Sequence, residues 1–278
     1  MNEAGVFTSD LSVNGFALCN QLGLTPLHQV MGNSIYQMGY QSSWGTTGYG
    51  AGLVEMDTMS EALNEVRGHA LHRLAEEAGN VGADAVVGVE TRTGETELGA
   101  SAGGNSLALE HMAIGTEVRR AGSGGGSPIL TELSIADYAL LLRAGIEPAG
   151  IVAWSSVFFA NYGYYYGMLG AGSGMGMGSM QNFELREFTQ AFYGARETVM
   201  TEIARQAAGL RASGVVGVRI GHTARPHTLS GGMGGAIGGF GGREIQGLLV
   251  TFTAIGTAIH QHDHADIQPP KPVIDLFA

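Results

Sequence analysis

Three histidines near the C-terminal end of the sequence have the spacing of a metal site. His260, His262 and His264 alternate along the chain directly after an apolar run that predicts a strand. Because side chains two residues apart in a strand point to the same face, the three imidazoles would lie together. Three imidazoles can hold Zn²⁺, Ni²⁺ or Cu²⁺, with water completing the coordination shell. The competing interpretation is a polar strand end whose histidines bind no metal.

Two other candidate sites lack the additional residues that metal or phosphate binding needs. His69 and His72 stand three residues apart on a predicted helix, but the sequence identifies no carboxylate or thiolate as a third ligand. We therefore favour a solvated helix face for this pair. The glycine-rich stretch 170–176 precedes a predicted helix, but no Gly-Lys-Ser or Gly-Lys-Thr follows it to hold phosphates. Nucleotide binding is not expected there.

The sequence assigns no catalytic residues. It contains no Ser-His-Asp, Cys-His or paired-carboxylate arrangement of the kind that supports nucleophilic or acid–base catalysis. Arg67 with Glu65, and Arg196 with Glu197, are interpreted as ordinary charges on helix surfaces. The single cysteine, Cys19, excludes an internal disulfide and a zinc site with two or more thiolates. A non-enzymatic protein is therefore expected.

Aromatic and methionine residues beside the glycine-rich loops have the composition of contact surfaces. Because these segments carry no Lys or Arg for a membrane-facing polar side, we favour a subunit interface over a membrane surface. The methionines are either thioether ligands for Cu(I) or, as we favour, an adaptable contact surface. These residues are Tyr36, Tyr40, Trp44, Tyr49, Tyr162, Tyr164, Tyr165, Tyr166, Met168, Met175, Met177 and Met180.

The last ten residues have the pattern of a docking peptide. A proline-containing spacer at 268–272 is stiff and extended. It leads to four large apolar residues, which are Val273, Ile274, Leu276 and Phe277. Such a peptide can add to a sheet edge or fill a groove on another subunit or protein, whereas the alternative is a frayed terminus.

The elements that must position these residues occur twice along the chain. Each half begins with an apolar run that predicts a buried strand, at 27–36 and again at 151–159. Three short sequences recur in the same order in both halves. They are GLTP at 23–26 matched by GIEP at 145–148, VVGV at 86–89 matched at 215–218, and AIGT at 113–116 matched at 254–257.

An amphipathic helix follows the first strand in each half. Apolar residues recur at spacings of three and four from Met59 to Ala78 and from Phe188 to Leu210. The predicted N-caps are Asp57 or Thr58 for the first helix, and Gln181 or Asn182 for the second. Two further strands then complete each half, at 85–92 and 107–118, and at 215–222 and 247–259. Residues 129–144 predict a short extra helix between the halves.

The sequence GADAVVGV at 82–89, placed directly after an amphipathic helix, resembles the YbjQ-like family of small bacterial proteins, which are labelled heavy-metal-binding domains. The second helix with LRASGVVG at 210–217, and the closing AIGT of each half, are similar to the same pattern. The resemblance covers about 23–118 and 145–259. It implies a dodecin-like β-α-β-β unit that assembles into rings of five, and it implies no catalytic residues.

Composition excludes several other classes of protein. The net charge of −11 disfavours nucleic acid as a partner. There are 46 glycines among 278 residues but only 7 prolines and no three-residue period, which excludes collagen. No apolar run is long enough for a membrane helix and no signal peptide is recognised, so a cytoplasmic protein is expected. The windows 11–54 and 149–183 contain no Asp, Glu, Lys or Arg, which predicts that they are buried between subunits.

These observations predict an α+β protein with two tandem β-α-β-β, dodecin-like units that form a ring-shaped oligomer. The expected domains are 1–120, a Gly/Ser linker at 121–128, a second domain at 129–262, and a proline-containing tail at 263–278. The expected function is a non-enzymatic scaffold or binding protein, a pentamer of tandem domains, with itself as the main partner and a second protein on the C-terminal peptide. The alternative is a metal-binding protein that uses His260, His262 and His264.

Overall fold

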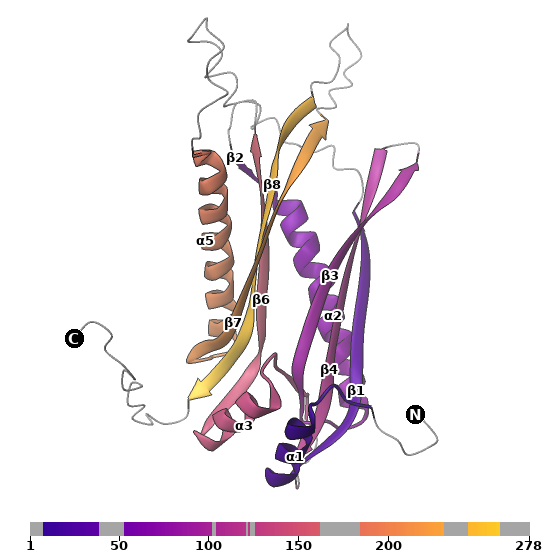
Figure 1. Cartoon of the computed structure of the whole chain (residues 1–278), viewed down its shortest axis with the longest axis vertical. Coiled ribbons are helices and arrows are strands. Elements are labelled where there is room, and N and C mark those ends of the chain that lie inside the picture. Colours follow the sequence, from indigo (N-terminus) through magenta and orange to yellow (C-terminus); the bar gives the residue numbers. More distant parts are fainter. Residues whose placement is uncertain are drawn as a thin grey trace, which may run out of the picture.

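A computed structural model describes residues 8–38, 53–101, 104–120, 122, 126–161, 184–230 and 244–261. It has the mixed α+β architecture that the sequence predicts (Figure 1). Two four-stranded sheets carry the fold, and two long helices pack on them. The element bounds below show how the two halves of the chain divide the sheets between them.

The first half of the chain builds most of one sheet. A short helix α1 (Val13–Gln21) leads into β1 (Leu24–Met38), and the long helix α2 (Asp57–Asn80) precedes the hairpin of β3 (Ala85–Ser101) and β4 (Gly104–Arg120). The strand order is β1-β4-β3, with antiparallel pairing throughout. The two-residue strand β5 (Ile129–Leu130) adds to the free edge of β3 in parallel.

The second half builds the other sheet with the same strand order. Helix α3 (Ile135–Arg143) leads into β6 (Ile146–Asn161), and α5 (Arg186–Gly209) precedes the hairpin of β7 (Gly214–Ser230) and β8 (Glu244–Gln261). The order is β6-β8-β7, again antiparallel. The three-residue strand β2 (Leu53–Glu55), which comes from the first half, adds to the free edge of β6.

Local details also correspond between the halves. Helices α2 and α5 both have 24 residues, and α1 and α3 both have nine. Each short helix begins after a serine, Ser12 or Ser134, whose side-chain oxygen accepts a backbone N–H of the first turn. Gly88 and Gly217 both have a φ of 64° at a register shift of the sheet, a conformation that favours glycine.

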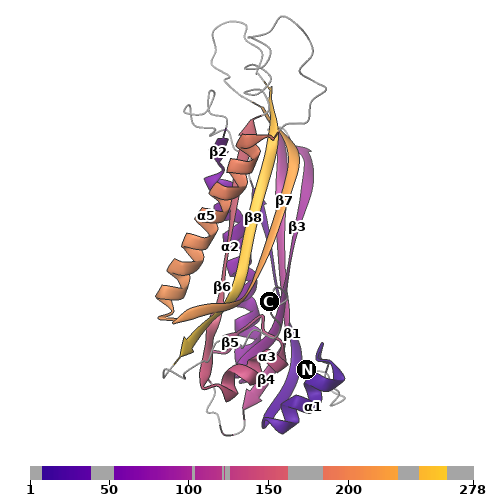
Figure 2. The same cartoon turned by 60° about the vertical axis from the view of Figure 1, so that its left-hand side comes forward.

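The elements stack in four layers (Figures 1 and 2). Helix α5 covers one face of the second sheet, where Val152, Phe158 and Val250 meet its apolar stripe. Helix α2 lies between the sheets: it packs on β1 and β4 of its own sheet and also on β6. One buried cluster therefore joins side chains of both halves, namely Met38, Met59, Ala62, Leu63, Val66, Leu109, Val157, Phe159 and Leu249.

Some local predictions were wrong. The residue before α2 is Met56 and the residue before α5 is Leu185, and neither makes a side-chain cap, in place of the polar caps expected from the sequence. The segment 129–144 begins as strand β5 rather than as helix, and α1 was not predicted. The strands are also longer than their apolar cores, because pairing continues past the last buried residue.

Candidate functional site at the junction of the two halves

The junction is the region where α2 of the first half packs on β6 of the second half. There, polar side chains of α2 bind the edge of β6. The Ser60 hydroxyl accepts the backbone N–H of Val157 at 2.9 Å. The Asn64 amide donates to the Ser155 carbonyl and accepts the Ser155 N–H, both at 2.8 Å. An edge strand has unpaired backbone groups that must be satisfied when they are buried. Side chains of the first half thus complete a strand of the second.

Arg67 is the most deeply buried cation of the described chain. Only 5% of it is exposed, so the sequence-based interpretation of an ordinary helix-surface charge was wrong. Its guanidinium donates to the Asn64 side-chain oxygen at 2.8 Å and to the Ser155 hydroxyl, and the carboxylate of Glu132 lies close enough to attract it. Burial lowers the pKa of Arg67 to about 10, and Glu132 opposes that effect.

Two short strands cross the junction in opposite directions. The segment from Ile129 to Leu133 adds to β3, where the Thr131 N–H donates to the Val86 carbonyl at 2.9 Å and the Val89 N–H donates to the Thr131 carbonyl at 3.0 Å. In the opposite direction, β2 of the first half adds to β6 of the second half. The Glu55 carboxylate of β2 accepts the Ser156 hydroxyl at 3.2 Å. Backbone pairing and side-chain packing together make the junction a continuous part of the fold.

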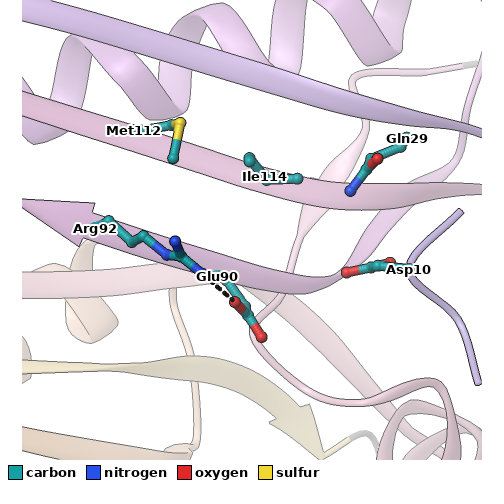
Figure 3. Close-up of a pocket in the computed structure, with 6 residues that line it drawn as sticks. All are labelled: Asp10, Gln29, Glu90, Arg92, Met112 and Ile114. Carbon is teal, nitrogen blue, oxygen red and sulfur yellow. Dashed lines mark ion pairs between the residues drawn. The ribbon is translucent and has the colours of Figure 1, made fainter.

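A small pocket opens on the face of the first sheet that α2 does not cover (Figure 3). It has a volume of about 170 Å³ and is lined by Asp10, Gln29, Glu90, Arg92, Met112 and Ile114. Arg92 pairs with Glu90 at 3.9 Å, and Asp10 accepts the Thr116 hydroxyl. The pocket thus combines two carboxylates and one guanidinium with the apolar side chains of Met112 and Ile114.

Two further titratable groups are buried in the first sheet. Burial, and repulsion from Glu77, raise the pKa of Glu117 to about 7. Burial, and the charge of Arg67, lower the pKa of His111 to about 4. The His111 Nδ1 atom lies 2.9 Å from the Thr93 hydroxyl. Glu117 and His111 come from one strand, and both side chains are buried in the interior.

The structure places only some of the residues that the sequence singled out. His260 lies in β8, half-buried and opposite Glu147 in the pairing register, while His262 and His264 lie outside the described residues. His69 and His72 are exposed on α2, and His72 lies 3.3 Å from Glu76. The glycine-rich and methionine-rich stretch 170–180, and the docking-peptide residues Val273, Ile274, Leu276 and Phe277, also lie outside the described residues.

A metal site is not formed by the side chains that the structure describes. Within residues 8–38, 53–101, 104–120, 122, 126–161, 184–230 and 244–261, no three of His, Cys, Asp and Glu converge on one point. Cys19 is buried, and burial raises the pKa of its thiol, which disfavours the thiolate that metals bind. The described donors therefore do not fit a heavy metal.

Comparison with known proteins places the chain beside one family and one mycobacterial relative. A family model described as "Putative heavy-metal-binding" and named YbjQ_1 matches residues 27–121. The encapsulin nanocompartment protein Rv1762c of Mycobacterium tuberculosis (strain ATCC 25618 / H37Rv) is 34% identical over 219 residues, which is 76% of each chain. No solved structure matches the chain.

Fold and comparisons together define an α+β protein with helix-covered antiparallel sheets. The chain belongs to the YbjQ-like family, and it shares three quarters of its length with the mycobacterial protein. None of its helices within the described residues is long and apolar enough to cross a membrane.

The junction was missed by sequence reasoning for a physical reason. A single apolar stripe identifies only the helix face that packs on its own sheet, whereas α2 packs on two sheets. The second contact uses Ser60, Asn64 and Arg67, which have the polarity of a solvated face. The available signal is the charge-free window 149–183, because most of β6 lies within it and residues 155–160 of that strand are all buried.

Proposed function

We propose that this chain is a self-assembling scaffold protein, with two YbjQ-like units per chain and five chains in a ring. The observation that carries the proposal is the relative's name, since a nanocompartment protein of M. tuberculosis shares 34% identity over three quarters of this chain. The corresponding strand orders of the two sheets support two units per chain. Five-fold symmetry rests on what the resemblance to the family implies.

The distribution of polar and apolar groups favours a scaffold over an enzyme. The described pocket holds about 170 Å³, below the roughly 300 Å³ at which ligand pockets commonly begin. The buried polar groups at the junction bind backbone and each other, which serves the packing of one unit on the next. Large apolar side chains such as Ile35 and Tyr193 are exposed on a single chain, as subunit interfaces require.

Light scattering coupled to size-exclusion chromatography tests the proposal on the purified full chain. We expect a mass near five times 28.9 kDa, and ring-shaped or closed particles in negative-stain electron micrographs. A strictly monomeric mass over the whole accessible concentration range would contradict self-assembly. A defined oligomer of another size would retain the scaffold and replace the five-fold symmetry.

A metal-binding function is a second proposal, for the C-terminal histidines alone. It is favoured by the half-buried position of His260 near the end of β8, from which the alternation with His262 and His264 continues. Calorimetric titration with Zn²⁺, Ni²⁺ and Cu²⁺ should give binding that the triple variant H260A/H262A/H264A loses. Equal affinities in the two proteins would remove this proposal, and the scaffold function would be unaffected.

A further inference from the structure

The contacts that join the two halves inside one chain have equivalent surfaces that remain uncovered on the two outer sides of the molecule. Within the chain, α2 packs on the second sheet and the segment 129–133 pairs with β3. The corresponding helix of the second half is α5, and the corresponding sheet edge is β7. Among the described residues, α5 packs only on its own sheet, and only β8 pairs with β7.

The open face of the first sheet corresponds to the closed face of the second. Ile35 of β1 corresponds to Val157 of β6, in the aligned sequences NSIY and SSVF. Val157 is fully buried beneath α2, whereas Ile35 is 67% exposed. Exposed apolar side chains on the outward faces of α5 and β7 stand at the other end of the molecule: they are Tyr193, Val218 and Ile220. An apolar surface at each end suits a head-to-tail contact.

Arg196 of α5 occupies the helix position that Arg67 occupies in α2, since both are the eleventh residue of a 24-residue helix. Arg67 is buried beside Glu132 and Ser155, but Arg196 is exposed. The position of Glu132 in the first half is taken by Asp10, because each carboxylate stands two residues before the serine that caps a short helix.

Asp10 lines the pocket on the open face of the first sheet, together with Glu90 (Figure 3). The residue in the second half that corresponds to Glu90 is Arg219, which pairs with Glu132. The pocket is therefore the counterpart of the place that Arg67 fills, and it carries two carboxylates at its rim. Arg92 also lines the pocket and pairs with Glu90 at 3.9 Å, while Asp10 supplies the second carboxylate. An arginine is the complementary occupant, since its planar guanidinium can bind a carboxylate through two parallel hydrogen bonds.

The pairing of the segment around Thr131 with β3 also has an equivalent in the first half, at residues 8–11. In the second half, the Thr131 hydroxyl lies 2.9 Å from the Thr257 hydroxyl while the segment around Thr131 pairs with β3. In the first half, the Ser9 hydroxyl lies 3.2 Å from the Thr116 hydroxyl. Residues 8–11 are thus already held on the first sheet as 130–133 are held on the second. No strand of the described chain pairs with their other side.

We propose that a second copy of this chain docks head-to-tail, with its Arg196 in the Asp10/Glu90 pocket and its β7 edge paired with residues 8–11 of the first copy. This inference rests on the proposed self-assembly and specifies its interface. The contact is heterologous, so each chain uses both of its ends, and a series of chains forms a ring when the rotation between neighbours closes.

Charge reversal tests the pocket contact in the full chain. R196E should raise at least tenfold the concentration at which half of the chains are assembled, measured by light scattering over a dilution series. The matched control is R205E, on the same helix: its counterpart in α2 is Glu76, which stays exposed beside the closed junction. R196E/D10R should restore assembly, because the two charges exchange places. R196E and R205E having equal effects would overturn the pocket contact.

Disulfide trapping tests the strand contact and its direction. Val86 pairs with Leu130 inside the chain, and the corresponding pair between chains is Val215 with Thr8. A T8C chain mixed with a V215C chain should yield a disulfide-linked dimer on mild oxidation, while either chain alone should yield none. Crosslinking of T8C to itself at equal yield would indicate a two-fold contact and overturn the head-to-tail arrangement.

The outcomes separate this interface from the proposed function. An oligomeric wild type that is insensitive to R196E and gives no mixed disulfide contradicts the interface and leaves self-assembly standing. A monomeric wild type contradicts both. Circular dichroism of each variant excludes unfolding as the cause of a lost assembly, and the rescue by R196E/D10R provides a second check on that point.

Discussion

The guanidinium of Arg67 is enclosed by groups from both halves of the chain. Replacing it by methionine keeps much of the side-chain volume but removes the donors to Asn64 and Ser155. It also leaves Glu132, whose side chain is 3% exposed, with Arg219 alone. Removing one partner of a buried ion pair costs about 3–5 kcal/mol. We expect a loss near the lower limit, because Arg67 attracts Glu132 without forming its ion pair, which is made by Arg219.

Chemical denaturation of R67M against wild type measures this cost. The matched control is R205M, because Arg205 is exposed on α5 and pairs only with Glu202 on the same helix. That control should change stability by no more than about 0.5 kcal/mol. Equal stabilities of R67M and wild type would show that the buried charge contributes nothing net to the fold.

The raised pKa of Glu117 predicts that the stability of the protein depends on pH. Its pKa in the folded protein is about 7, above the 4.5 of an unperturbed glutamate. The folded state therefore holds the proton more tightly than the unfolded state, and stability from this group is lost as the pH rises from 4.5 to 7. E117Q removes the titration, so at pH 8 it should be about 1–3 kcal/mol more stable than wild type.

Denaturation curves at pH 4.5 and pH 8 test that sign. The difference in unfolding free energy between E117Q and wild type should be small at pH 4.5, where the carboxyl is protonated, and large at pH 8. Comparing the difference between the two proteins cancels the other titrating groups. A difference that does not change with pH would contradict the raised pKa.

At the scale of elements, close approach of α2 to β1 depends on a glycine. A Cβ placed on Gly32 would collide with the backbone carbonyl of Ala70 and the backbone nitrogen of Leu74. G32A should therefore separate the helix from the strand and cost about 1–3 kcal/mol of stability. The matched control is G68A, on the exposed side of α2 with nothing within 4 Å of the new Cβ. That change should stabilise the protein by about 0.5–1 kcal/mol, so thermal melts should move in opposite directions.

The elements themselves were largely predictable from the sequence, and their ends were not. The stripes that run from Met59 and from Phe188 identified both long helices, because their apolar spacing is set by the sheet that each covers. The start of α2 is set differently. The Met56 N–H donates to the Val157 carbonyl of the other sheet at 2.8 Å, so a tertiary contact rather than the Asp57 side chain fixes the first turn.

The contact between the two halves was only partly predictable from the sequence. The repeated short sequences predict two similar halves, and the strand orders β1-β4-β3 and β6-β8-β7 correspond to one another. They could not show that α2 packs between the two sheets, because contacts such as that of Asn64 with Ser155 join positions 91 residues apart. Polar residues in that contact are indistinguishable from surface residues until the second sheet is placed.

For the whole molecule, the junction predicts that the two halves stay together when the peptide chain between them is cut. Gly122 and Gly126 are exposed, so a protease recognition sequence inserted there should be cleaved in the native state. The buried cluster shared by α2 and both sheets, and the two strand additions, should then hold the fragments in one particle on size-exclusion chromatography. Cleaved R67M should lose that association at lower denaturant than the cleaved wild type, since its junction is weakened. Fragments that separate without denaturant would mean that the covalent link, rather than the packing of α2 on β6, joins the halves.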